Sequence, residues 1–165
     1  MVWLRLLHIV AGTFWVGSAV FGALILFPTA RAAGPEGGRF LGRLMQRMGP
    51  ALGIAMLFTI IPGFMMYGRL SAGSDRAWVT SSQGLALGTG AVATILAVIL
   101  GIVVNAPARG KMVALRKSLE TPGGTPDPAA AAQLAQLQAR IERGAQVVAV
   151  FLVAAAGAMA VARYL

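Results

Sequence analysis

The sequence of 165 residues contains no cysteine, which excludes disulfide bonds, thiolate metal sites and CxxC redox chemistry. Charged residues make up only 12% of the chain, whereas a soluble domain carries about 25%. The five acidic residues all fall outside the hydrophobic runs, so the chain lacks the membrane carboxylate that a small proton-coupled exporter needs. The only histidine, His8, has no acidic residue near it in the sequence. No nucleophile–base constellation is therefore visible, and the sequence does not decide whether the protein is an enzyme.

Apolar residues, by contrast, make up 58% of the chain, and the mean hydropathy is +0.76. A membrane-spanning helix needs about 20 predominantly apolar residues. Four segments meet this requirement, at about residues 3–27, 50–68, 84–106 and 145–162. The first is longer than the roughly 7–15-residue core of a cleaved signal peptide, so we expect it to remain as a helix. The sequence predicts a single all-α domain over residues 1–165, an integral membrane four-helix bundle.

The net charge of +9 comes from basic residues that cluster between the hydrophobic runs, which argues against nucleic-acid binding. Ten of them lie in the first and third loops: Arg31, Arg39, Arg43, Arg47, Arg109, Lys111, Arg116, Lys117, Arg140 and Arg143. Four lie on the other side: Arg5, Arg69, Arg76 and Arg163. The positive-inside rule therefore predicts cytoplasmic first and third loops and both termini outside. We expect a multi-pass protein of a bacterial-type plasma (inner) membrane.

Parts of the basic loops have helical periodicity. Residues 36–49 and 129–144 place apolar side chains at helical spacing, and we expect them to extend the second and fourth spans on the cytoplasmic side, with a kink at Gly49–Pro50. Basic amphipathic stretches of this kind lie against anionic lipid headgroups. The principal partner predicted for this protein is therefore the lipid bilayer.

Small and polar residues within the spans suggest where helices meet. Gly53 and Gly63 in the second span and Gly157 in the fourth are expected where backbones approach closely. Asn105 and Gln146 lie at the cytoplasmic ends of the third and fourth spans, and we expect them to bond to each other or to helix ends. Few polar residues remain to line a cavity for a transported small molecule.

His8 is the residue within a span that is best suited to chemistry, because ionisable side chains in membranes are costly and usually functional. Antiparallel spans should bring the thioethers of Met65, Met66 and Met159 to the same membrane depth as its imidazole. Imidazole with thioether suits haem b, and soft thioethers also suit Cu(I). The alternative is that the histidine lies at the interface and bonds to water or backbone, and that the methionines are packing residues.

Two arginines lie at the same predicted edge of the membrane as His8. Arg5 and Arg163 are positioned to pair with haem propionates or, alternatively, with lipid phosphates. The chain has one histidine, so a bis-histidine haem would need a homodimer in which each copy contributes His8.

The first span resembles a known family. Leu7-His8-Ile9, Trp15-Val16-Gly17 and Phe27-Pro28 are similar to the opening helix of the copper-resistance D family and of the related HemJ-type protoporphyrinogen oxidases. The resemblance covers some 25 residues and implies a helical membrane protein that holds haem or copper through His8. HemJ-type enzymes carry further histidines and a membrane lysine, which this chain lacks, so protoporphyrinogen oxidation is not expected. A copper importer would carry more histidine and methionine.

The leading hypothesis is a haem b- or copper-binding membrane protein that serves in electron transfer or in metal or haem handling, with a membrane redox partner. Its ligands would be His8 with Met66 or Met159, and Met65 is a further candidate. One alternative is a structural or accessory membrane subunit without a cofactor. Another is a small-molecule transporter.

Overall fold

The computed structural model describes residues 1–71, 76–119 and 128–165 of the chain. Within these ranges every regular element is a helix, and four uninterrupted helical stretches are long and apolar enough to cross a membrane. The predicted all-α membrane bundle is thus confirmed, and the chain is a multi-pass membrane protein. The elements are α1 Val2–Phe21, η1 Gly22–Leu26, α2 Phe27–Ala32, α3 Gly34–Ser71, α4 Arg76–Val79, α5 Ser82–Ile99, η2 Leu100–Asn105, α6 Ala106–Leu119, α7 Pro128–Val161 and η3 Ala162–Tyr164.

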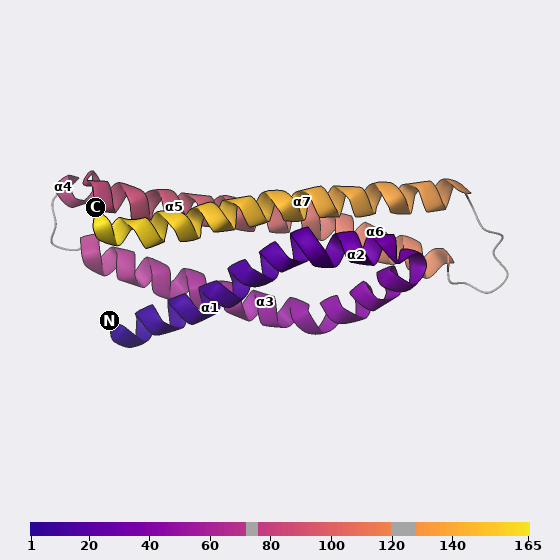
Figure 1. The fold of residues 1–165 in the computed structure, drawn as a ribbon, viewed down its shortest axis with the longest axis horizontal. Coiled ribbons are helices and arrows are strands. Elements are labelled where there is room, and N and C mark those ends of the chain that lie inside the picture. The colour runs from indigo at the N-terminus through magenta and orange to yellow at the C-terminus, as the bar shows by residue number, and fades with distance from the viewer. Residues whose placement is uncertain (72–75, 120–127) are drawn as a thin grey trace.

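The long helices exceed the thickness of a membrane. At 1.5 Å per residue, the 38 residues of α3 extend about 57 Å, whereas the hydrocarbon core of a bilayer is about 30 Å thick. The helix runs without interruption through residues 36–49 and 50–68, with Pro50 and Pro62 inside it. Figure 1 shows that α3 changes direction near its middle. The α7 helix likewise joins residues 129–144 to the last apolar segment.

The four long helices form two antiparallel hairpins (Figure 1). In one hairpin α1 packs along α3, and in the other α5 packs along α7. The hairpins meet mainly where α1 and η1 cross α7. Both chain termini lie at one end of the bundle, which we call the terminal end, and the opposite end, with the α2–α3 turn and α6, is called the basic end.

Alanine makes the contact between the hairpins. Ala23 in η1 packs against Ala145 and Ala149 in α7, and Phe27 covers this cluster. Large apolar side chains mostly point outward instead, and Leu152 is the largest side chain that is fully buried. Helices in lipid associate through close packing of small residues, because the lipid supplies no hydrophobic force between them. An alanine core facing inward and large apolar residues facing outward are what such a bundle requires.

The first and third long helices each contain a π-turn just before a proline. In η1 the N–H of Phe27 bonds to the carbonyl of Gly22, five residues back, and Pro28 follows. In η2 the N–H of Ala106 bonds to the carbonyl of Gly101, and Pro107 follows. A proline lacks the N–H that an α-helix needs at that position and crowds the preceding turn. The π-turn widens the helix before the proline, so the helix continues in both hairpins.

Two arginines fasten the hairpins together at the basic end. Arg31 of α2 forms an ion pair with Glu142 of α7, with 3.3 Å between Nη1 and Oε2. Arg116 of α6 donates from Nη1 to the carbonyl of Gly38 in α3 at 2.7 Å. Arg31 and Arg116, which the sequence places among the ten basic residues of the first and third loops, therefore bond within the protein.

The turn between α2 and α3 depends on glycine. Gly34 has a φ of +63°, in the left-handed region that favours glycine. Gly37 lies so close to the carbonyl of Ala30 that a Cβ atom would collide with it. The backbones of α2 and α3 can meet here because neither position carries a side chain.

We predict that Gly37→Ala destabilises the protein, because its Cβ would force α2 away from α3. The free energy of unfolding should fall by about 1–3 kcal/mol, which is typical of overpacking. Gly42→Ala is the matched control in the same helix, where a Cβ meets nothing within 4 Å. It should be neutral or stabilising by up to about 1 kcal/mol, since alanine is the better helix former. Thermal unfolding in detergent measures both, and equal midpoints would refute the tight turn.

Candidate functional site

His8 bonds to the neighbouring helix through one ring nitrogen. Its Nδ1 lies 2.6 Å from the carbonyl oxygen of Thr59 in α3. A carbonyl only accepts hydrogen bonds, so Nδ1 carries the proton and donates it. In the neutral ring the lone pair is then on Nε2. This bond ties α1 to α3 and fixes both the orientation and the tautomer of the imidazole.

The carbonyl that accepts from His8 lies in the turn of α3 that precedes a proline. Pro62 lacks an N–H donor, and its ring crowds the carbonyl four residues earlier, that of Phe58, in the turn that also contains Thr59. The Thr59 hydroxyl bonds to the carbonyl of Ala55 at 2.7 Å and so turns away from His8. The bond from His8 goes to Thr59, one residue after Phe58, so it adds a donor to this turn without replacing the N–H that Pro62 lacks.

Two glycines leave room for these contacts. A Cβ on Gly63 would lie 2.9 Å from Cε1 of the His8 ring, closer than real Cβ contacts allow. Gly12, one turn after His8 on α1, faces Thr59, whose Cγ2 would lie 3.4 Å from an added Cβ. The expectation that Gly63 marks a close approach is thus met by the imidazole rather than by another backbone. Gly53 and Gly157 have nothing within 4 Å, so the packing role predicted for them is wrong.

The second nitrogen of His8 reaches the surface of the chain. Among the described residues, the one side-chain polar atom that is both buried and without a partner is Asn105 Oδ1. The ring is half-buried, and its Nε2 is therefore not sealed in the bundle. Histidines that bind metals usually donate their other N–H to a backbone carbonyl, as His8 does here. The same bond is found in histidines that only join two helices, so it agrees with a structural role as well as with that of a ligand.

The three candidate methionines take different positions. Met66 lies on the same side of α3 as Thr59 and Pro62, one turn further toward the terminal end, and is half-buried. Met65, its neighbour, is 44% exposed. Met159 packs against α5, where its Cγ and Cε would lie 3.0 and 3.2 Å from a Cβ on Gly90. Of the three methionines, Met66 is therefore the one that lies on the face of α3 turned toward His8.

The two candidate arginines lie exposed at the terminal end. Arg163 stacks on the ring of Tyr164, with 4.7 Å between its Cζ and the ring centroid. Arg5 makes no side-chain bond with the described part of the protein. Both guanidinium groups remain available to anionic groups outside the chain.

Acidic and cysteine ligands do not supplement this site. Within residues 1–71, 76–119 and 128–165, no three His, Cys, Asp or Glu side chains gather where they could hold a metal ion. A metal bound at His8 would therefore draw its other ligands from thioethers, from a macrocycle or from a second chain.

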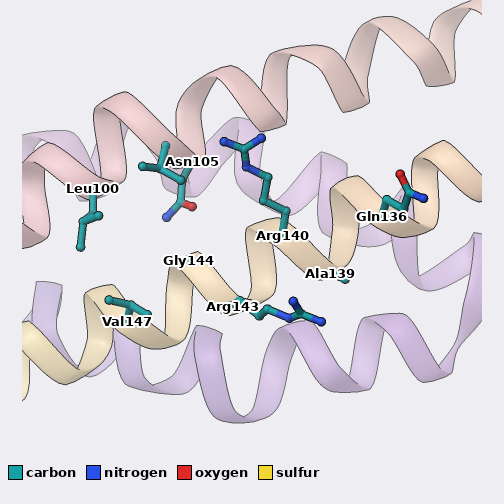
Figure 2. A pocket seen from close by; sticks show the side chains of 9 residues that line it. Leu100, Asn105, Gln136, Ala139, Arg140, Arg143, Gly144 and Val147 are labelled. Carbon is teal, nitrogen blue, oxygen red and sulfur yellow. The ribbon is translucent and has the colours of Figure 1, made fainter.

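A second polar region lies at the basic end, between η2–α6 and α7 (Figure 2). It is an open groove of about 490 Å³, with Asn105 on one wall and Arg140 on the other. Figure 2 shows the Asn105 side chain directed toward Gly144 of α7, and Arg140 extending across toward the opposite helix. Asn105 is 2% exposed, and its Oδ1 has no partner in the described residues. The sequence predicts a hydrogen bond of Asn105 with Gln146 or with a helix end, and among the described residues its Oδ1 makes neither.

Gly144 makes the position of Asn105 possible, because an added Cβ would collide with Oδ1. Sequence reasoning missed this pair. The available signal was a glycine beside Arg143, at the level where the asparagine ends the third span. That signal was insufficient, because it does not reveal which helix faces the asparagine.

Comparisons of the chain with protein-family models, with curated proteins and with solved structures found no match.

We predict that Gly144→Ala lowers stability by about 1–3 kcal/mol, because the new methyl group displaces the Asn105 amide. Gly157→Ala is the control on the same helix, where a Cβ has open space. Thermal unfolding in detergent compares the two variants. A second comparison uses Asn105→Ala, which removes the colliding side chain. In that background Gly144→Ala should cost less, and an unchanged cost would show that the amide is not the obstacle.

Proposed function

We propose that this protein binds haem b in the membrane, with Nε2 of His8 as an axial ligand, and that it serves in electron transfer or haem handling. The observation that supports this proposal is the bond from His8 Nδ1 to the Thr59 carbonyl. In the tautomer that this bond selects, the lone pair is on Nε2, and Gly63 leaves room for the ring. The resemblance of the first span to the copper-resistance D and HemJ-type proteins agrees with it.

Haem b is preferred to Cu(I) because of the methionines. A Cu(I) site would need two or more soft ligands around His8. Met66 is on the appropriate face of α3, whereas Met65 is exposed and Met159 contacts Gly90. A haem supplies four of the six iron ligands itself, so one histidine and one further group are sufficient.

The sixth ligand is either Met66 of the same chain or His8 of a second copy. Arg5 and Arg163 are exposed at the terminal end, where they are available to haem propionates. We further propose that this end faces outward and that the basic end lies in the cytoplasm of a bacterial-type plasma membrane. The ten-to-four distribution of basic residues supports that orientation.

The proposal is tested by the absorption spectrum of the detergent-purified protein, supplied with haem and recorded from the near-ultraviolet to the red. The wild type should show the bands of a six-coordinate haem, and His8→Ala should abolish them. A parallel copper analysis addresses the alternative metal. A wild-type protein without haem or copper would contradict the proposal and leave the cofactor-free accessory role.

Glycine variants distinguish a loss of haem ligation from a loss of folding. Gly63→Ala crowds the imidazole and should lower haem affinity roughly tenfold or more, as displacement of a supporting contact does. Gly53→Ala, on the same helix in open space, should bind haem as the wild type does.

The sixth ligand is identified by Met66→Leu, with Met65→Leu as its neighbour control. A spectral change confined to Met66→Leu indicates the thioether, and no change in either indicates a second His8.

A further inference from the structure

The groove at the basic end changes in character along its length. Leu100, Val104 and Val147 line one part, and Gln136, Arg140 and Arg143 line the other. The apolar residues lie within the hydrophobic runs of the third and fourth long helices. The basic residues lie just beyond these runs, on the side of the basic end. The groove therefore crosses from the level of acyl chains to the level of headgroups.

A second hollow continues the basic part. It measures about 290 Å³, shares Gln136 and Arg140 with the first, and adds Lys111 from α6. No Asp or Glu is among the residues that line either hollow. The acidic side chain nearest to Arg140 and Arg143 in the sequence, Glu142, pairs with Arg31 of α2 and not with the cations of the groove.

The polar lining also includes the orphaned amide of Asn105, whose Oδ1 has no partner among the residues described. A buried carbonyl-type oxygen without a donor is unfavourable, and a polar ligand seated beside it can supply one after a small rotation of the amide. Ligand sites in proteins typically have volumes of about 300–1,000 Å³, a range that includes the larger hollow.

We propose that this groove binds one anionic phospholipid, of the hydroxyl-bearing phosphatidylglycerol type. Its phosphate lies beside Lys111 and Arg140, which lines both hollows, and an acyl chain follows Leu100, Val104 and Val147. Figure 2 shows Arg140 extending across the groove toward the opposite helix. The headgroup hydroxyls face the polar wall that holds Asn105. Basic pockets between membrane helices recognise lipid headgroups by this combination of cations and adjacent apolar surface.

The inference is tested by thermal unfolding of the purified protein in a nonionic detergent, titrated with short-chain phosphatidylglycerol. Phosphatidylcholine with the same chains, inorganic phosphate and glycerol 3-phosphate are the comparison ligands. Phosphatidylglycerol should raise the unfolding midpoint with a saturating dose response, and the other three should not. Equal effects of phosphatidylcholine, or of the soluble anions, would overturn the lipid assignment.

Charge variants locate the site. Arg140→Gln with Lys111→Gln should weaken phosphatidylglycerol binding about thirtyfold, since each cation near a lipid phosphate contributes about a fivefold factor. Arg39→Gln with Arg43→Gln removes the same charge from exposed positions on α3 and should change affinity by less than about twofold. Equal weakening by both pairs would show general surface attraction instead of a site. If the first pair does not fold, Arg140→Gln alone should weaken binding about fivefold, and unchanged binding would refute the groove.

Discussion

The structure depends on how apolar helices satisfy their backbone hydrogen bonds around proline. In lipid no water replaces a missing partner, so each proline inside a spanning helix needs a local solution. Before Pro28 and Pro107 the helix widens into a π-turn, in which the residue ahead of the proline donates to a glycine five positions back. Pro62 lies instead inside a continuous α-helix. There His8 of the neighbouring helix bonds to the carbonyl of Thr59, next to the Phe58 carbonyl that the proline leaves without its N–H partner.

The two hairpins have the same topology but differ in where their prolines lie. Each has a first helix with a π-turn and proline, followed by a long unbroken return helix. Only the first hairpin has a proline within the apolar part of its return helix, and only that hairpin carries a histidine. In the second hairpin the return helix has Gly144, and the space it leaves is filled by Asn105. The same plan therefore leads to an imidazole site near the terminal end and a polar groove near the basic end.

The sequence was sufficient for the architecture, because composition and the length of apolar runs determine how many helices cross a membrane. It was insufficient for most contacts, because these depend on the rotation of each helix about its axis. Gly53 and Gly63 look alike in the sequence, yet one faces open space and the other the His8 ring. The rise per residue predicts a common depth for Met66 and Met159, but not that Met159 turns toward Gly90.

The alanine contact between the hairpins limits where a cofactor bound to His8 would lie. The hairpins are held together by Ala23, Ala145 and Ala149, so α1 and α7 approach closely and leave little space between them for a macrocycle. The imidazole lies between α1 and α3, with Nε2 at the surface of the chain. A haem ligated there would contact the outer side of this hairpin, where large apolar side chains of α1 are exposed. The residues that would hold it besides His8 are then those that reach this outer side, either Met66 on the same face of α3 or His8 of a second copy.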